Sequence, residues 1–335
     1  MIKDLIRQLV NKKDLTAGQM QQVMQWILSG DADEADIVNF LTSLNEKGQT
    51  VEEITAAVTE MLKYVQPIIV DRPNILDTCG TGGDRKGTFN ISTISALVAS
   101  GAGVTVAKHG NRSVSSKCGS ADILEALGVN INMDQAKIKQ CLEEIGIAFL
   151  FAPKLHLAMN SVMQARKKIA QKTIFNILGP LINPARATNQ LIGVYSKEWV
   201  KPLAQVLHNL GSKHILVVHG ADGLDEVTTA DKTFVSEVKE GALKDYEIRP
   251  EEFGLTRAKA ADLKGGSIQE NVKIAQDILA GKSGRARDIV LLNSACAIYA
   301  ADKISTIAEG IILAKKSIDS GAAMAKLELL KEYSQ

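Results

Sequence analysis

The apolar residues of positions 1–66 recur every three or four residues, which is the period of an amphipathic helix. One such stripe consists of Met20, Val23, Met24 and Ile27. Two of the expected helices begin with a capping-box sequence, Thr16 with Gln19 in one and Thr50 with Glu53 in the other. These patterns predict a small N-terminal domain built only of helices.

The hydrophobic pattern changes after residue 66, where short continuous apolar runs alternate with helical stretches. The runs are Ile75 to Thr78, Val104 to Ala107, Ile147 to Phe151, Leu191 to Tyr195 and Ile215 to Val218. Continuous apolar strands separated by helices are typical of a parallel sheet covered on both faces. We therefore expect an α/β fold in which residues 67–335 form a large domain around a mainly parallel central sheet. The helix-rich stretch 153–185 is expected to join in part the helical domain of residues 1–66.

Composition narrows the class of protein. The chain has 335 residues with 39 Lys and Arg against 38 Asp and Glu, giving a formal net charge of +1. Dedicated nucleic-acid binders usually carry a stronger basic bias, so neither nucleic acid nor a membrane is expected as a partner. The four cysteines form no C-x-x-C pair, and the N-terminus is interrupted by charged residues. A cytoplasmic location is the expectation.

Three of the expected strands each end in a polar, glycine-bearing cluster. The clusters read CGTGGD after the first strand, KHGNRSVSSK after the second and HGADGLDE after the last. Open parallel sheets bind ligands at the carboxyl ends of their strands. The three clusters are therefore candidates for one shared pocket.

The glycine-rich cluster has the composition of a phosphate-binding turn. Glycines allow backbone N–H groups to approach phosphate oxygens, and a helix expected to start near Asn90 would direct its N-terminus at the same anion. The sequence is neither a Walker A loop nor G-x-G-x-x-G. A simple tight turn between strand and helix is the alternative.

The other two clusters carry opposite charges. Lys108, Arg112 and Lys117 are cations suited to a highly charged anion, although a solvated basic loop has the same composition. Asp225 and Glu226 suit Mg²⁺, which binds oxygen ligands and usually shares them with substrate phosphates. An acidic surface turn is the alternative for the second cluster. Together the clusters indicate a metal–polyphosphate site.

These segments resemble the anthranilate phosphoribosyltransferase family over nearly the whole chain. The similarity rests on CGTGGD, NIST, VAKHGNRSVSSKCGSADILEALG, TIFNILGPLINPA and HGADGLDE, in that order. The resemblance implies a small helical domain and a large α/β domain, a fold shared with the pyrimidine nucleoside phosphorylases. It also implies a homodimer joined through the helical domain. The implied reaction, a step of tryptophan synthesis, transfers phosphoribose from PRPP to anthranilate and releases pyrophosphate.

Site residues follow from the resemblance position by position. The PRPP contacts it implies are Gly80, Gly83, Asp84, Thr88, Asn90, Ile91, Ser92, Thr93, Lys108, His109, Gly110, Asn111, Arg112, Ser113, Val114, Ser115, Ser116 and Ser120. The anthranilate contacts it implies are Gly80, His109, Asn111, His156, Arg166 and Gly179. Two Mg²⁺ ions are expected, with Ser92 at one and Asp225 and Glu226 at the other. Lys108 would act electrostatically on the leaving pyrophosphate, and no residue is expected to serve as an essential acid or base.

The chain departs from the family pattern in two places. The family commonly has His-Pro-Ala-Met where this chain has His156-Leu157-Ala158-Met159. It often has Leu-Gly-Ile-Arg-Thr where this chain has Ile169-Ala170-Gln171-Lys172-Thr173. Two other functions stay open from the sequence: a pyrimidine nucleoside phosphorylase, and a non-catalytic relative that binds nucleic acid through its basic loop.

Overall fold

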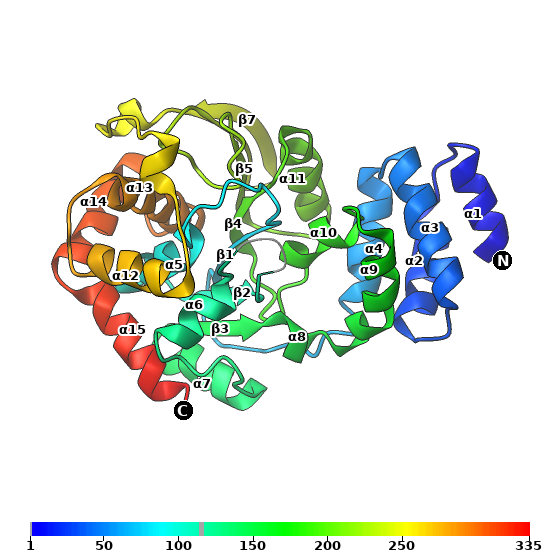
Figure 1. Cartoon of the computed structure of the whole chain (residues 1–335), viewed down its shortest axis with the longest axis horizontal. Coiled ribbons are helices and arrows are strands. Elements are labelled where there is room, and N and C mark those ends of the chain that lie inside the picture. The colour runs from blue at the N-terminus through cyan, green and yellow to red at the C-terminus, as the bar shows by residue number, and fades with distance from the viewer. Residues whose placement is uncertain (1, 114–116) are drawn as a thin grey trace.

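The computed structural model describes residues 2–113 and 117–335, which form a helical part and a larger α/β part (Figure 1). The N-terminal helices are α1 (Ile2–Val10), α2 (Ala17–Leu28), α3 (Glu34–Lys47) and α4 (Val51–Met61). Both capping boxes predicted for this part are formed, at Thr16 before α2 and at Thr50 before α4. Gly48 follows α3 with a φ of 88°. The prediction of an all-helical N-terminal segment is confirmed.

A seven-stranded sheet forms the centre of the α/β part, in the order β3-β2-β1-β4-β5-β6-β7. The strands are β1 (Leu76–Gly80), β2 (Val106–Gly110), β3 (Ile147–Phe151), β4 (Asn189–Gly193), β5 (His214–Gly220), β6 (Thr233–Lys239) and β7 (Ala242–Ile248). Strands β1 to β5 pair in parallel, whereas β6 and β7 pair antiparallel. The mainly parallel sheet predicted from the apolar runs is confirmed.

Two details of the sheet differ from the sequence prediction. The hairpin β6–β7 was not predicted, because polar residues interrupt both strands and β7 is largely exposed at the sheet edge. The strands β1 and β2 also extend further toward their carboxyl ends than the apolar runs indicated. Lys108 and His109 consequently lie within β2 and are buried, instead of lying in the loop after it.

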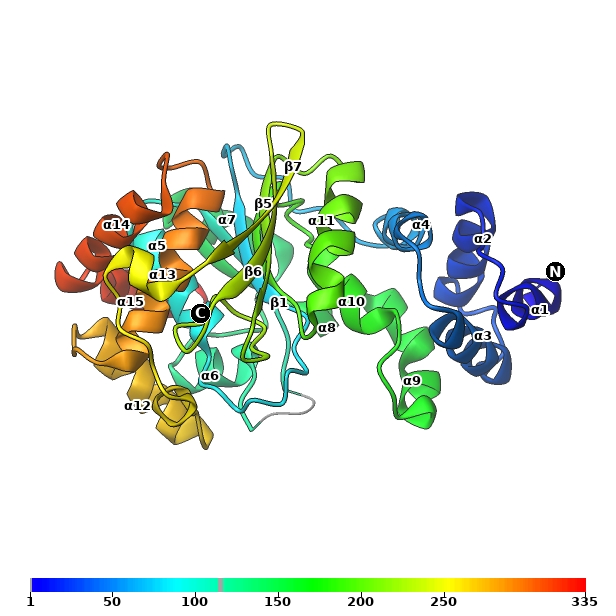
Figure 2. The same ribbon diagram turned by 90° about the horizontal axis from the view of Figure 1, so that it is seen from above.

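Helices cover both faces of the sheet (Figure 2). On one side, the strands share a hydrophobic cluster with α5 (Ile91–Gly101), α12 (Ile268–Leu279), α13 (Arg285–Ala300), α14 (Ile307–Asp319) and α15 (Ala322–Tyr333). The other face packs against α10 (Phe175–Leu178) and α11 (Val200–Asn209). Two further helices, α6 (Ser120–Ala126) and α7 (Gln135–Glu144), lie between β2 and β3 in sequence.

The segment 153–185 connects the two parts of the molecule. It contains α8 (Ala152–Leu155), a 3-10 helix at Leu157–Val162, α9 (Met163–Ile169), α10 and a 3-10 helix at Gly179–Leu181. Helix α9 packs on α3, and α10 and α11 pack on α4. One hydrophobic cluster therefore continues from the N-terminal helices through this segment to one face of the sheet.

Candidate active site

The three polar clusters begin at the carboxyl ends of β1, β2 and β5, and the parallel arrangement of these strands places them at one edge of the sheet. Glu226 lies beyond β5, and its Oε1 accepts a hydrogen bond from the backbone N–H of Ser92 at 3.2 Å. The ammonium of Lys108 on β2 lies 3.4 Å from the Ser92 hydroxyl. Residues from three separate segments of the chain therefore meet at the start of α5.

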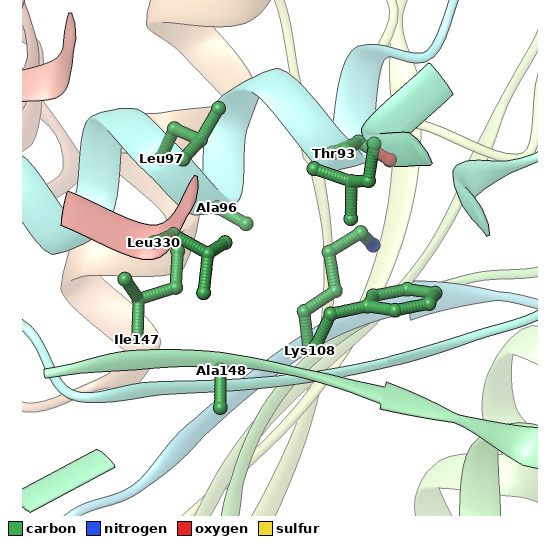
Figure 3. Close-up of a pocket in the computed structure, with 9 residues that line it drawn as sticks. Thr93, Ala96, Leu97, Lys108, Ile147, Ala148 and Leu330 are labelled. Carbon is green, nitrogen blue, oxygen red and sulfur yellow. The ribbon is translucent and has the colours of Figure 1, made fainter. Parts of the chain in front are cut away.

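Lys108 is 3% exposed and carries its charge into the protein interior. Its ammonium also donates to the carbonyl of Thr78 on β1. Figure 3 shows the Lys108 side chain along a small pocket, with its nitrogen on the side of Thr93. The pocket is otherwise mostly apolar and is lined by Thr93, Ala96, Leu97, Lys108, Leu124, Ile147, Ala148, Phe149 and Leu330. Burial lowers the pKa of Lys108, and the charges of Asp77 and Glu226 oppose this shift.

Asp77 is a site residue that the sequence analysis missed. It is fully buried on β1 and accepts hydrogen bonds from the His109 backbone N–H at 3.0 Å and from the Asn183 amide at 2.8 Å. Burial raises the pKa of Asp77, while the charge of Lys108 lowers it. The carboxylate thus balances the buried ammonium. The sequence did carry a signal for Asp77, because it is the single acidic residue inside the apolar run Ile75 to Thr78.

The acidic pair lies at the same edge of the sheet. Burial raises the pKa of Asp225 well above its usual range, and the carboxylates of Asp84 and Glu226 raise it further. Burial raises the pKa of Glu226 to about 7, against the effects of Lys108 and the Ser92 N–H. Asp84 Oδ2 is buried and has no hydrogen-bond donor in the described part of the chain. Carboxylates crowded in this way repel one another, so a cation is favoured between them.

These acidic residues suit a magnesium ion that also binds phosphate. Mg²⁺ prefers oxygen ligands and typically takes only one or two from protein carboxylates. Across residues 2–113 and 117–335, no group of three or more His, Cys, Asp or Glu side chains is placed to hold a metal by itself. The remaining ligands would then come from substrate oxygens. Asp225, Glu226 and the hydroxyl of Ser92 fit this chemistry.

The glycine-rich loop comes very close to the segment that carries Asp225. A Cβ on Gly80 would lie 3.2 Å from Asp225 Oδ2, and one on Gly193 would lie 1.6 Å from the Asp225 carbonyl oxygen. Only glycine fits the second position without moving the backbone. The loop is also joined to β4, because the Thr81 N–H donates to the Gly193 carbonyl at 2.9 Å. Gly80 therefore lies beside Asp225, which also accepts a hydrogen bond from the Gly82 backbone.

Helix α5 begins beside this loop, with Asn90 at its N-cap, as predicted. The Asn90 amide donates to the Cys118 carbonyl at 3.0 Å. Asn90 Oδ1 and Thr93 Oγ1 are buried without partners among the described residues. Ile91 is buried, and Thr88 forms an isolated bridge with Lys264 that closes the loop. The free N–H groups of a helix N-terminus favour an anion at this position.

The basic loop after β2 is exposed and only partly described. Ser120 Oγ accepts from the Asn111 N–H at 3.2 Å and lies against Gly110. The Arg112 guanidinium pairs with Asp122 at 3.0 Å and with Glu125 at 2.8 Å, so an incoming phosphate would compete with these carboxylates. The Ser113 N–H donates to Asp122 at 3.1 Å. The predicted contacts Val114, Ser115 and Ser116 lie outside the described residues.

His109 and His156 form a buried pair. Their Nε2 atoms lie 2.9 Å apart, and the ring centroids are 4.9 Å apart. Burial lowers the pKa of His109 to about 3 and that of His156 to about 4, so both rings are neutral at pH 7. His109 also hydrogen-bonds to the Gly179 backbone. Three residues predicted to line the anthranilate channel are thus brought together.

Arg166 lies on the last turn of α9, where it is half-buried. Its guanidinium carbon lies 5.8 Å from the centre of the Phe175 ring. No carboxylate of the described ranges pairs with it. Burial lowers the pKa of Arg166. An unpaired, partly desolvated guanidinium is suited to binding a carboxylate from a ligand.

Within the described residues, no helix is long and apolar enough to cross a membrane.

Comparison with known proteins agrees with this geometry. Residues 3–65 match the model of the glycosyl transferase family helical bundle domain, and residues 72–324 match that of the glycosyl transferase family a/b domain. The anthranilate phosphoribosyltransferase of Methanobrevibacter smithii is 50% identical, covering 100% of this chain and 99% of the relative. That of Symbiobacterium thermophilum is 48% identical over 99% and 98% of the two chains.

Solved structures show the same similarity. Anthranilate phosphoribosyltransferase from Thermus thermophilus superposes with a TM-score of 0.93 at 39% identity, covering 98% of each chain. The Saccharomyces cerevisiae enzyme in complex with PRPP and Mg superposes with a TM-score of 0.90 at 29% identity, covering 99% of this chain and 97% of that one. The chain belongs to the anthranilate phosphoribosyltransferase family.

Proposed function

We propose that this protein transfers the 5-phosphoribosyl group of PRPP to the amine of anthranilate and releases pyrophosphate, in tryptophan biosynthesis. The observation that carries the proposal is the meeting of Lys108, Ser92 and Glu226 at the start of α5, beside the glycine-rich loop. This arrangement combines a cation, a helix N-terminus and a carboxylate for magnesium. These are the groups that a diphosphate needs.

The PRPP side of the site is formed by two loops and the N-terminus of α5. Backbone groups of the glycine-rich loop and of Asn90 to Thr93 would bind the phosphates, and Ser120 would support the basic loop around them. Two Mg²⁺ ions are proposed, one at Ser92 and one at Asp225 and Glu226. Bound magnesium would neutralise charge on the leaving pyrophosphate. Lys108 would stabilise the same charge from the sheet side.

The anthranilate side is proposed to lie between α9 and the end of β2. Arg166 would bind the substrate carboxylate through two parallel hydrogen bonds. Gly80, Asn111 and Gly179 would line the path to the sugar. The pair His109 and His156 would present neutral rings, since burial lowers both pKa values. Their neutrality avoids placing an added positive charge beside Lys108.

The chemistry needs no strong general base. The amine of anthranilate is already neutral at pH 7 and can attack the anomeric carbon as the bond to pyrophosphate breaks. The proton that the new secondary ammonium then loses can pass to the released pyrophosphate or to water. Catalysis then depends on placing the amine correctly and on stabilising the departing charge. Lys108, held by Thr78 and Ser92, is pre-oriented for the second task.

The direct test follows anthranilate fluorescence on addition of PRPP and Mg²⁺. A decrease in anthranilate fluorescence that requires the protein, PRPP and Mg²⁺ together, and that EDTA prevents, would support the assignment. A folded protein that leaves the fluorescence unchanged would contradict it. Phosphorolysis of thymidine or uridine would then distinguish the nucleoside phosphorylase alternative.

We infer further that residues 1–66, with part of 153–185, form a helical domain through which two copies pair. The packing of α9 on α3 supports the domain assignment. The exposed Val10 at the end of α1 offers an apolar contact for a second copy. A cytoplasmic location is inferred from the four buried thiols Cys79, Cys118, Cys141 and Cys296. Light scattering of the purified protein would determine its mass in solution.

A further inference from the structure

Lys172 joins the glycine-rich loop to the segment that carries Arg166. It lies between α9 and α10, only six positions after Arg166. Its ammonium donates to the Gly83 carbonyl at 3.0 Å. The same ammonium lies 3.2 Å from the centre of the Tyr195 ring, which follows β4. One side chain therefore contacts both the loop and the sheet.

The contact lies at the middle of a loop whose two ends are held elsewhere. The Thr81 N–H donates to the Gly193 carbonyl on β4 at 2.9 Å, and the Thr81 hydroxyl accepts from the N–H of Tyr195, just after β4, at 3.0 Å. At the other end, the Gly265 N–H donates to the Gly87 carbonyl at 2.9 Å. Gly82 and Gly83 both have positive φ, of 63° and 80°, and glycines in this region give a loop little intrinsic stiffness. Lys172 supplies a tether at Gly83, next to Asp84.

Electrostatics support a specific role for this lysine. Burial lowers the pKa of Lys172, as does Arg85, while Asp225 and Asp84 raise it. Its ammonium therefore interacts with Asp225, which is proposed to bind magnesium, and with Asp84, which follows Gly83. The stem also packs on the loop, since a Cβ on Gly83 would lie 3.2 Å from Lys172 Cε.

We propose that Lys172 is a positioning residue that holds Gly83 and Asp84 in the conformation that binds PRPP with magnesium. It does so from the α9–α10 connection, six positions after the arginine that is proposed to bind anthranilate. This role rests on the proposed function and adds to it a residue outside the PRPP and anthranilate contacts. The tether acts through the loop, without contact to either substrate.

The test compares variants at Lys172 with a matched control. Lys172→Met keeps most of the stem but removes the charge and the donor, whereas Lys172→Arg keeps both. Lys167→Met changes an exposed lysine on α9 and serves as the control. The dissociation constant for PRPP with Mg²⁺, without anthranilate, is measured by titration calorimetry. The Michaelis constants for both substrates and the melting temperature are measured in parallel.

Lys172→Met is expected to weaken PRPP binding about tenfold, the effect of losing one charged hydrogen bond. The Michaelis constant for anthranilate at saturating PRPP should change less than about twofold, since Arg166 is intact. Lys172→Arg and Lys167→Met should bind PRPP like the parent. Unchanged PRPP binding in Lys172→Met would overturn the proposal, as would equal losses for both substrates with a lowered melting temperature. A parent protein that binds no PRPP would instead refute the proposed function.

Discussion

The carboxylate of Glu226 accepts a hydrogen bond from the backbone N–H of Ser92 at 3.2 Å, across 134 positions of the chain. Ser92 lies in the first turn of α5, so its N–H is one of those that the helix leaves without an internal partner. Glu226 satisfies that donor and, at the same time, brings a carboxylate to the end of β1. The helix N-terminus and the acidic turn are therefore parts of one site.

Glu226→Gln tests the metal assignment. The amide can still accept from Ser92 but has lost the charge that Mg²⁺ needs. The magnesium concentration for half-maximal activity should rise at least about tenfold. Metal affinity falls by about this factor even when only a hydrogen-bond partner of a metal ligand is removed. Activity is measured against Mg²⁺ at saturating PRPP, with the exposed Glu332→Gln as control. Replacing Asp225 and Glu226 together should give a larger shift, and an unchanged midpoint in the double variant would contradict the site.

Arg166→Ala tests the acceptor side. Removing the guanidinium leaves the anthranilate carboxylate without its charged partner, so the Michaelis constant for anthranilate should rise about 10- to 100-fold. The constant for PRPP should change much less. Initial rates with each substrate varied in turn measure both values. Lys167→Ala is the control, because it removes a neighbouring cation from the same helix and leaves Arg166 in place. A similar rise in the Michaelis constant for anthranilate in this control would contradict a specific role for Arg166.

The His109–His156 pair predicts a dependence of stability on pH. Both folded pKa values, about 3 and about 4, lie below the value near 6.5 expected for an unfolded chain. The unfolded state therefore binds more protons between these values, and stability is lost as the pH falls from 6.5. Between pH 7 and pH 5 the free energy of unfolding should fall by about 2 to 4 kcal/mol from this pair.

Urea unfolding at several pH values measures this dependence. His156→Gln removes one titrating ring and should reduce the contribution of the pair to the slope by roughly half. A slope that is identical in the parent and in His156→Gln would contradict the assignment of the effect to this pair.

Ala170 ends α9 with a φ of 51° and a ψ of 18°, in the left-handed region. This conformation costs a residue with a Cβ about 1 to 2 kcal/mol, and glycine avoids the cost. Because glycine also loses more entropy on folding, Ala170→Gly should stabilise the protein by a net amount of about 0.5 to 1 kcal/mol. The midpoint of urea unfolding should rise. Ala325→Gly, at an exposed position inside α15, should have the opposite effect.

The local pattern of residues was enough to predict much of this protein. Amphipathic periodicity and the capping boxes at Thr16 and Thr50 predicted the N-terminal helices, because a helix start depends on side chains within one turn. Apolar runs predicted β1 to β5 as a parallel sheet, because strands that are covered on both faces are mostly apolar and do not alternate with polar residues. The position of CGTGGD and HGADGLDE after such strands then indicated one shared site.

The tertiary structure decided what depends on residues far apart in the chain. The hairpin β6–β7 was missed because both strands keep polar residues, and because β6 forms by pairing with β5 and the edge strand β7 by pairing with β6. The balance between buried Asp77 and Lys108 joins two strands, and the tether from Lys172 to Gly83 joins segments 89 positions apart. Sequence periodicity reports which face of an element is buried. It does not report which buried charges meet, because that depends on the order in which the strands pair.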